Sequence, residues 1–151
     1  MVGYKAEKVD ICSAMNYWLI KSEPYKYSWD QMVADGSTYW DGVRSYPARI
    51  HLRAMKRGDI CLFYHSNEGK EMVGLTRVIK ESYQDPTTED EKWVAVDVEA
   101  IKPLIKSVTL AQVKANETLT NMALVRQGRL SVGPVEEFEF EEIMKLAETS
   151  L

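Results

Sequence analysis

Four segments of the sequence end a short apolar run in polar or charged residues, and these residues are well placed for chemistry. The segments are Lys21-Ser22-Glu23-Pro24, Trp40-Asp41-Gly42-Val43-Arg44, Tyr64-His65-Ser66-Asn67 and Arg129-Leu130-Ser131-Val132. If the apolar runs are strands, the polar residues lie at the rim of a sheet, where they reach a ligand without being buried unpaired. The pattern predicts that the four ends converge on one binding site.

The residue types in these segments suit a flat ligand with a hydrogen-bonding edge. Trp40 offers an aromatic surface on which a planar group stacks. Hydroxyl and amide groups for the edge of that group come from Ser22, Ser66, Asn67 and Ser131. Arg44 and Arg129 suit a phosphate or a carboxylate, because a guanidinium binds either group with two parallel hydrogen bonds. Each of these residues can also have a purely structural role. Arg44, for example, also suits an ion pair with Asp41.

Catalytic and cofactor motifs are missing from the sequence. Ser22, His65 and Glu23 supply a serine, a histidine and an acid, but no nucleophile-elbow glycines surround Ser22. There is no phosphate-binding GxxxxGK or GxGxxG motif. The two histidines, His51 and His65, lack the CxxC or HxxxH spacing of a metal site. We therefore expect no catalytic residue, no cofactor and no metal.

Length and composition indicate a single globular domain. The chain has 151 residues, of which 45% are hydrophobic and 28% charged. No apolar run approaches the roughly 20 residues of a membrane helix, so no membrane partner is expected. The net charge is −4, yet residues 43–57 hold five basic residues and no acid, whereas residues 136–151 hold six glutamates. The basic stretch is a candidate nucleic-acid surface, although charge alone favours a solvated helix face.

Hydrophobic periodicity predicts an α+β fold, in which five or six mostly antiparallel strands form a curled sheet or small barrel flanked by short helices. Strands are predicted at residues 17–21, 38–40, 60–65, 72–79, 93–101 and 130–132, the last halted by Gly133-Pro134. Helices are predicted after the capping residues Ser28 and Thr109 and at residues 48–55, 119–126 and 135–147. In the helix at 48–55, Ile50 and Ala54 are expected to face inward. Residues 1–15 lack periodicity and are expected to be a loosely ordered extension.

Taken together, the motifs resemble those of EVE domains, a family of the PUA-like superfamily. The similar segments include YWLIKSEP (17–24), WDGVR (40–44), LFYHSN (62–67) and RLSVGPV (129–135), and the resemblance covers the chain as one domain, residues 16–151. It implies a PUA-like β-barrel flanked by helices. It also implies a pocket for a modified nucleobase in DNA or RNA, by analogy with the aromatic cage of YTH domains.

The resemblance assigns ten residues to this pocket. They are Ser22, Glu23, Trp40, Val43, Arg44, His65, Ser66, Asn67, Arg129 and Ser131. Arg49 and Arg53 are expected to help hold the nucleic-acid backbone. The sequence departs from the family's GVRNYQAR at Ser45 and Pro47, which bears on the choice of base and on the pocket rim more than on the fold.

The expected function is therefore non-enzymatic recognition of a modified base in DNA or RNA. Two alternatives stay open: a nucleotide-processing enzyme that uses His65 as a base with Glu23, and a protein-interaction module that uses the acidic C-terminal helix. Cys12 and Cys61 make no disulfide framework and predict reduced thiols. The expected location is the cytoplasm in a bacterium, or the nucleus for a eukaryotic homologue.

Overall fold

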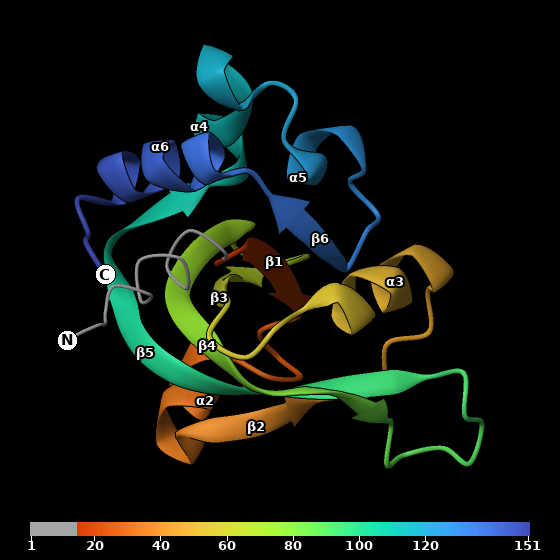
Figure 1. Cartoon of the computed structure of the whole chain (residues 1–151). Coiled ribbons are helices and arrows are strands. Elements are labelled where there is room, and N and C mark those ends of the chain that lie inside the picture. Colours follow the sequence, from red (N-terminus) through yellow and green to blue (C-terminus); the bar gives the residue numbers. More distant parts are fainter. Residues whose placement is uncertain (1–14) are drawn as a thin grey trace, which may run out of the picture.

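The computed structural model describes residues 15–151, so the expected extension lies outside the described residues except for Met15. The fold is α+β, with six strands in one mixed sheet of order β2-β5-β4-β3-β1-β6. The strands are β1 (Tyr17–Ser22), β2 (Ser37–Trp40), β3 (Ile60–His65), β4 (Glu71–Gln84), β5 (Val94–Thr109) and β6 (Val132–Val135). The sheet curls strongly but does not close within the described residues, and β2 and β6 form its two edges (Figure 1).

One strand pair is parallel, and it lies between β4 and β6 in the sheet. β1 pairs with β3 in parallel from Tyr17 opposite Ile60 to Ser22 opposite His65. All the other pairings are antiparallel, including that of β1 with the edge strand β6. The expectation of a mostly antiparallel sheet is confirmed, and the parallel pair decides which strand ends lie together.

The β4–β5 hairpin is much longer than predicted and wraps around the rest of the sheet (Figure 1). The register between β4 and β5 shifts at several points, and such bulges bend and twist a strand pair. Pro103 lies inside β5, where a proline was not expected. β2 pairs with β5 only as far as Glu99. Beyond that residue β5 has β4 as its single neighbour, so a proline at position 103 is tolerated.

Short helices cover both faces of the sheet (Figure 1). They are α2 (Trp29–Asp35), α3 (Tyr46–Ala54), α4 (Leu110–Ala115), the 3-10 helix η1 (Glu117–Leu119), α5 (Ala123–Arg126) and α6 (Glu137–Ala147). The predicted caps are confirmed: the side chain of Ser28 accepts from Gln31 N at the start of α2, and Thr109 forms a full capping box with Gln112.

The alternation of side chains along the strands divides the core into two clusters. On β1, Trp18 and Ile20 pack with α2, α3 and β2 on one face of the sheet, whereas Leu19 packs with α4–α6 on the other. β3 follows the same rule, with Phe63 in the first cluster and Leu62 in the second. The central strands are thus buried on both faces, which explains why they read as continuous apolar runs.

A buried carboxylate that the sequence did not single out joins the starts of β1 and β3. Asp59 accepts hydrogen bonds from Asn16 N (3.1 Å), Lys56 N (2.9 Å) and Trp18 Nε1 (2.9 Å), and it is almost fully buried. Because the three donors satisfy the carboxylate, it is buried at the starts of β1 and β3 without the cost of an unpaired buried charge.

Two sequence expectations about packing are wrong. Ile50 is 61% exposed and Ala54 is also exposed, because α3 turns the face that carries Ala48 and Leu52 toward the core. Gly133 and Pro134 do not halt the last strand but lie within β6. β6 is an edge strand that pairs only with β1, so the missing N–H of Pro134 faces no further strand.

The close approach of α2 to β4 predicts that position 74 accepts only glycine. A Cβ atom on Gly74 would overlap the indole ring of Trp29, whereas a Cβ on Gly128 would meet nothing within 4 Å. We expect Gly74→Ala to lower the free energy of unfolding by about 1–3 kcal/mol, the usual cost of overpacking. The matched variant Gly128→Ala should stay within about 0.5 kcal/mol of wild type in urea unfolding. Equal stability of the two variants would contradict the packing described.

Candidate functional site

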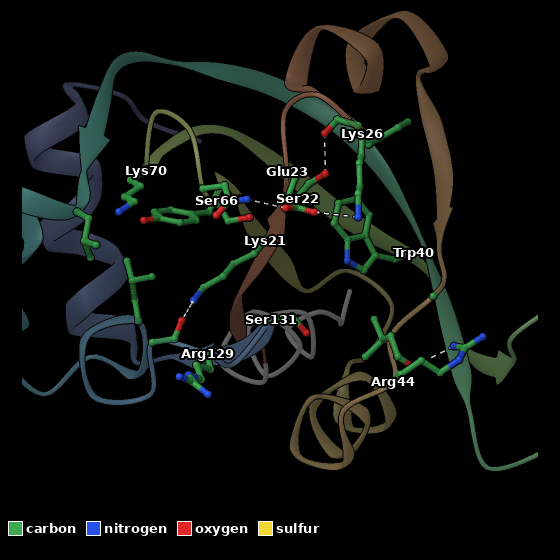
Figure 2. A pocket seen from close by; sticks show the side chains of 18 of the residues that line it. Lys21, Ser22, Glu23, Lys26, Trp40, Arg44, Ser66, Lys70, Arg129 and Ser131 are labelled. Atoms are coloured by element: carbon green, nitrogen blue, oxygen red, sulfur yellow. Dashed lines mark hydrogen bonds and ion pairs between the residues drawn. The ribbon is translucent and has the colours of Figure 1, made fainter.

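The four strand ends surround one cavity of about 870 Å³, which opens to solvent. Nine of the ten residues predicted for the pocket line it, and His65 is the exception. Figure 2 shows how the labelled side chains lie, with Trp40 and Arg44 on one side, Arg129 and Ser131 below, and Lys70 on the far side. The structure thus brings together side chains from segments far apart in the chain.

The sheet topology explains why these ends meet. Parallel strands end at the same end of the sheet, so Ser22 and His65 lie side by side. β6 runs antiparallel to β1, so the start of β6 lies at this same end of the sheet. There Lys21 N donates to Ser131 O at 3.0 Å. Trp40 comes from β2, the opposite edge of the curled sheet, yet it shares a core cluster with Val132 of β6. The cavity is lined by residues of β2 and by Ser131 before β6, and these two edge strands do not pair.

Trp40 forms an aromatic wall of the cavity. Its ring meets Tyr27 edge-on at 6.2 Å between centroids and Phe63 at 5.6 Å, so its position is fixed from two sides. The side chain is only 9% exposed and still lines the cavity. No described residue accepts a hydrogen bond from its indole N–H. The wall can therefore offer both a flat surface and one donor.

Ser22 and Glu23 are held by the protein itself. The hydroxyl of Ser22 donates to Tyr27 O at 2.6 Å. The carboxylate of Glu23 accepts from Asn67 Nδ2 at 2.7 Å and Tyr25 Oη at 2.9 Å and pairs with Lys26 at 3.0 Å. Hydrogen bonding from Lys26, followed by Tyr25, lowers the pKa of Glu23, so the group is an anion at neutral pH. These contacts fix the shape of the rim and leave Ser22 and Glu23 with little capacity to donate to a ligand.

Three other predicted residues keep their polar groups available. The side chains of Ser66, Arg129 and Ser131 line the cavity, and no described residue forms a hydrogen bond or ion pair with them. A serine hydroxyl both donates and accepts, and a guanidinium only donates. These groups can therefore bind the edge and the charge of a ligand directly.

His65 supports the cavity from outside. Its Nε2 accepts a hydrogen bond from the backbone N–H of Trp29 at 3.0 Å, which satisfies a free donor in the first turn of α2. Burial lowers the pKa of His65, in spite of the opposing charges of Glu71 and Asp30. The ring is thus a neutral acceptor that is already engaged, and it is not placed to act as a general base with Glu23 in the cavity.

Arg44 is anchored by a buried carboxylate that the sequence did not reveal. Asp85 is fully buried and accepts from Gly42 N at 2.8 Å, Arg44 Nη1 at 3.0 Å and Thr87 N at 2.7 Å. Burial alone would raise the pKa of Asp85, but the hydrogen bonds from Thr87, Gly42 and Arg44 outweigh it and lower the pKa to about 2. Gly42 has a φ of 75°, a left-handed backbone conformation that suits glycine.

The cavity is strongly basic, although the protein is acidic. Lys21, Lys26, Lys70 and Lys114 join Arg44 and Arg129 on its walls, against only Glu23 and Asp41. The chain as a whole has a net charge of −4. The sequence placed Lys21 at the rim of the sheet, but it did not reveal Lys26, Lys70 and Lys114, because they come from separate segments that only folding brings together. The concentration of positive charge favours an anionic ligand.

Lys21 is the most enclosed of these bases. Its ammonium crosses the cavity and donates to Gly128 O at 2.8 Å, and it lies 5.8 Å from the centre of the Tyr64 ring (Figure 2). Burial lowers the pKa of Lys21. The two further N–H donors of the ammonium remain for a ligand.

Arg49 and Arg53 do not line the cavity. Arg53 is exposed on α3, and Arg49 packs against aromatic rings beside the cavity while its Nη1 donates to Lys92 O at 3.1 Å. No residue of α6 lines the cavity, and its buried side chains, including Phe140 and Ile143, pack against the sheet. Within residues 15–151, no cluster of three metal-binding side chains occurs and no helix is long and apolar enough to cross a membrane.

The sequence matches the EVE domain family over residues 16–146, nearly the whole chain. The chain belongs to the EVE domain family. Mouse thymocyte nuclear protein 1 is 36% identical to it over 168 residues, which cover 89% of this chain and 74% of the mouse protein. The predicted family is therefore confirmed.

Solved structures agree with this assignment and with the fold. This EVE domain superposes on Rpa0253 of Rhodopseudomonas palustris with 50% identity and a TM-score of 0.85, covering 89% of this chain and 94% of that one. Human THYN1 in complex with 5-methylcytosine containing DNA matches with 33% identity and a TM-score of 0.83, over 90% and 99% of the two chains. A yeast YTH domain from Zygosaccharomyces rouxii shares the fold alone, at 14% identity and a TM-score of 0.60, over 91% and 89% of the chains.

The anchoring of Arg44 predicts a pH-dependent contribution to stability. We expect Asp85→Asn to lower the free energy of unfolding at pH 7 by roughly 2 kcal/mol, because the amide repels the donors of Gly42 and Arg44 and the pKa is shifted from 3.8 to about 2. A lowered pKa stabilises the fold above the ordinary pKa of the group. The stability gap should therefore be constant above about pH 5 and shrink as the pH falls from 4 toward 2.

Urea unfolding at a series of pH values measures this gap. The exposed Glu89 lies in the same loop and has no hydrogen bond to a described residue, so Glu89→Gln is a charge-matched control that should follow wild type. A gap between wild type and Asp85→Asn that is unchanged at pH 2.5 would show that the ionised carboxylate is not what stabilises the loop.

Proposed function

We propose that this EVE domain binds nucleic acid by taking one base, which carries a modification such as a methyl group, into the cavity without catalysing a reaction. The observation that carries this proposal is an aromatic wall inside a cavity whose lining is basic, in a protein whose net charge is negative. A base needs a surface for stacking, and its phosphates need cations. The cavity supplies both within one site.

The complex of human THYN1 with 5-methylcytosine containing DNA supports the choice of polymer and of modification. That relative is a member of the same family and shares the fold over most of its length. Nucleic-acid binding by an EVE domain is thus established for a relative, and the base pocket of this chain is our proposal.

The roles within the cavity follow from which groups remain available. Trp40 stacks on the base, and Val43, which is apolar and lines the cavity next to it, contacts a methyl group. Ser66 and Ser131 bind the polar edge of the base. Arg129 and Lys21 hold the flanking phosphate, because their donors face the cavity with few or no protein partners.

Energetics favour a single strand or a locally opened duplex as the ligand. Extruding a paired base costs a few kcal/mol. Stacking on one aromatic side chain returns about 1–3 kcal/mol per base. These two magnitudes nearly cancel, so a base that is already unpaired binds more tightly. The placement of His65 supports the proposal of binding without catalysis, because its Nε2 is engaged by Trp29 N and its ring does not line the cavity.

Substitution of the aromatic wall tests the proposal. We expect Trp40→Phe to weaken binding of a single-stranded nonamer with a central 5-methylcytosine about fivefold or more, because the smaller ring stacks less and lacks the N–H donor. Trp29→Phe is a matched control, since Trp29 is equally buried and packs on the same Phe63 but does not line the cavity. Fluorescence anisotropy measures both, and equal affinity of the two variants for the nonamer would refute the role of Trp40.

Salt dependence tests the phosphate contact separately. We expect Arg129→Ala to reduce the slope of log affinity against log salt concentration by about 0.7, the value for one phosphate of a single strand. Lys145→Ala removes an exposed positive charge on α6, away from the cavity, and should leave the slope unchanged. If both variants change the slope alike, the effect reflects net charge and Arg129 is no specific contact.

A further inference from the structure

A second aromatic surface lies beside the cavity and has no part in the roles assigned so far. Tyr46 from the first turn of α3 and Trp93, which directly precedes β5, stand 5.3 Å apart between ring centroids with an interplanar angle of 37°. Tyr46 is 55% exposed. We call this pair the outer platform. An exposed tyrosine beside a half-buried tryptophan leaves aromatic surface open to solvent.

Cations surround the outer platform. The guanidinium of Arg49 lies 5.0 Å from the Tyr46 ring centre and 5.7 Å from that of Trp93, and the ammonium of Lys92 lies 5.9 Å from Trp93. Arg49 has no carboxylate partner among the described residues, and its Nε is buried without a hydrogen-bond partner. The positive charge at this surface is therefore only partly compensated, which favours an anion nearby.

Helix α3 extends this surface. Ile50 and Arg53 follow Tyr46 and Arg49 at a spacing of four residues, so they lie on the same side of the helix one turn further on. Ile50 and Arg53 are exposed. Aromatic and apolar groups interleaved with arginines are typical of surfaces that bind single-stranded nucleic acid.

The outer platform is continuous with the cavity through Arg44. This side chain lines the cavity, and its guanidinium also lies 5.7 Å from the centre of the Trp93 ring. The ion pair with Asp85 fixes the guanidinium between the two sites. A strand that places one base in the cavity would therefore bring its neighbouring nucleotide past Arg44 to Tyr46.

We propose that the outer platform is a second nucleotide subsite, which stacks the base next to the one in the cavity while Arg49, Lys92 and Arg53 contact its phosphates. This inference rests on the proposed function, because the cavity base sets the register of the strand. It assigns a ligand class, single-stranded nucleic acid of at least two nucleotides, to residues that do not line the cavity.

A double-mutant cycle between protein and ligand tests the outer platform. The probes are a single-stranded nonamer with a central 5-methylcytosine and the same nonamer with abasic sites on both sides of that base. We expect wild type to bind the abasic nonamer roughly tenfold more weakly than the intact one. Tyr46→Ala should bind the intact nonamer roughly tenfold more weakly than wild type and lose little more on the abasic one.

Two further variants separate stacking from folding. Tyr46→Trp keeps a stacking ring and should restore wild-type affinity, whereas Phe138→Ala removes an equally exposed aromatic from α6 and should change nothing. Full affinity of Tyr46→Ala for the intact nonamer, or losses that simply add in the cycle, would overturn the proposal. Failure of wild type to bind the nonamer at all would overturn it together with the proposed function.

The cycle also distinguishes this proposal from the proposed function. A third nonamer carries the abasic site at the central position only. If this change leaves the affinity of wild type unaltered, the cavity does not take a base and the proposed function fails. The coupling between Tyr46 and the flanking bases would then persist only if the outer platform itself binds nucleotides.

Discussion

The parallel pairing of β1 with β3 is the constraint on which the rest of the molecule depends. It sets Ser22 beside His65 at one end of the strands, and the antiparallel partner β6 then brings Ser131 to the same end. Asp59 holds the other end of the pair by binding Trp18 and the backbone before β1. Because both strands are buried on both faces, a slip of one residue would exchange the two core clusters, so the register is tightly fixed. The geometry of the strand ends inherits that precision.

Because the sheet does not close, a cavity remains at this end of the strands. β2 and β6 do not pair within the described residues, and α3 lies in the gap between them, in contact with β5 and β6. Alternation along β1 then gives the cavity two different walls. Ser22 points to the side of Trp40, and Lys21 points to the side of Tyr64. A closed barrel of the same strands would fill this volume with side chains, so the open seam is what allows a base-sized ligand to enter.

Local signals in the sequence predicted the strands and the caps, because each depends on a few neighbouring residues. The meeting of the four ends was predicted from the polar pattern that they share, and it depends on the sheet topology. The family resemblance added the topology, which periodicity alone does not supply. The sequence failed where a distant partner decides. Asp85 is one carboxylate in an acidic loop until Gly42 and Arg44 fold onto it. Pro134 signals the end of a strand unless the strand is known to lie at an edge, and the exposure of Ile50 depends on which face of α3 packs against the core.

The cavity is organised before any ligand arrives, and this decides how selective it can be. Ser22 and Glu23 spend their hydrogen bonds within the protein, and Arg44 is fixed by a carboxylate that stays ionised down to a pH of about 2. A rim held in this way does not need to be ordered on binding, so less conformational entropy opposes association. In the proposed complex, the uncommitted hydroxyl groups of Ser66 and Ser131 then face the base as isolated polar atoms. A base that fails to pair with them leaves them unsatisfied on burial, and this penalty discriminates between bases more strongly than stacking does.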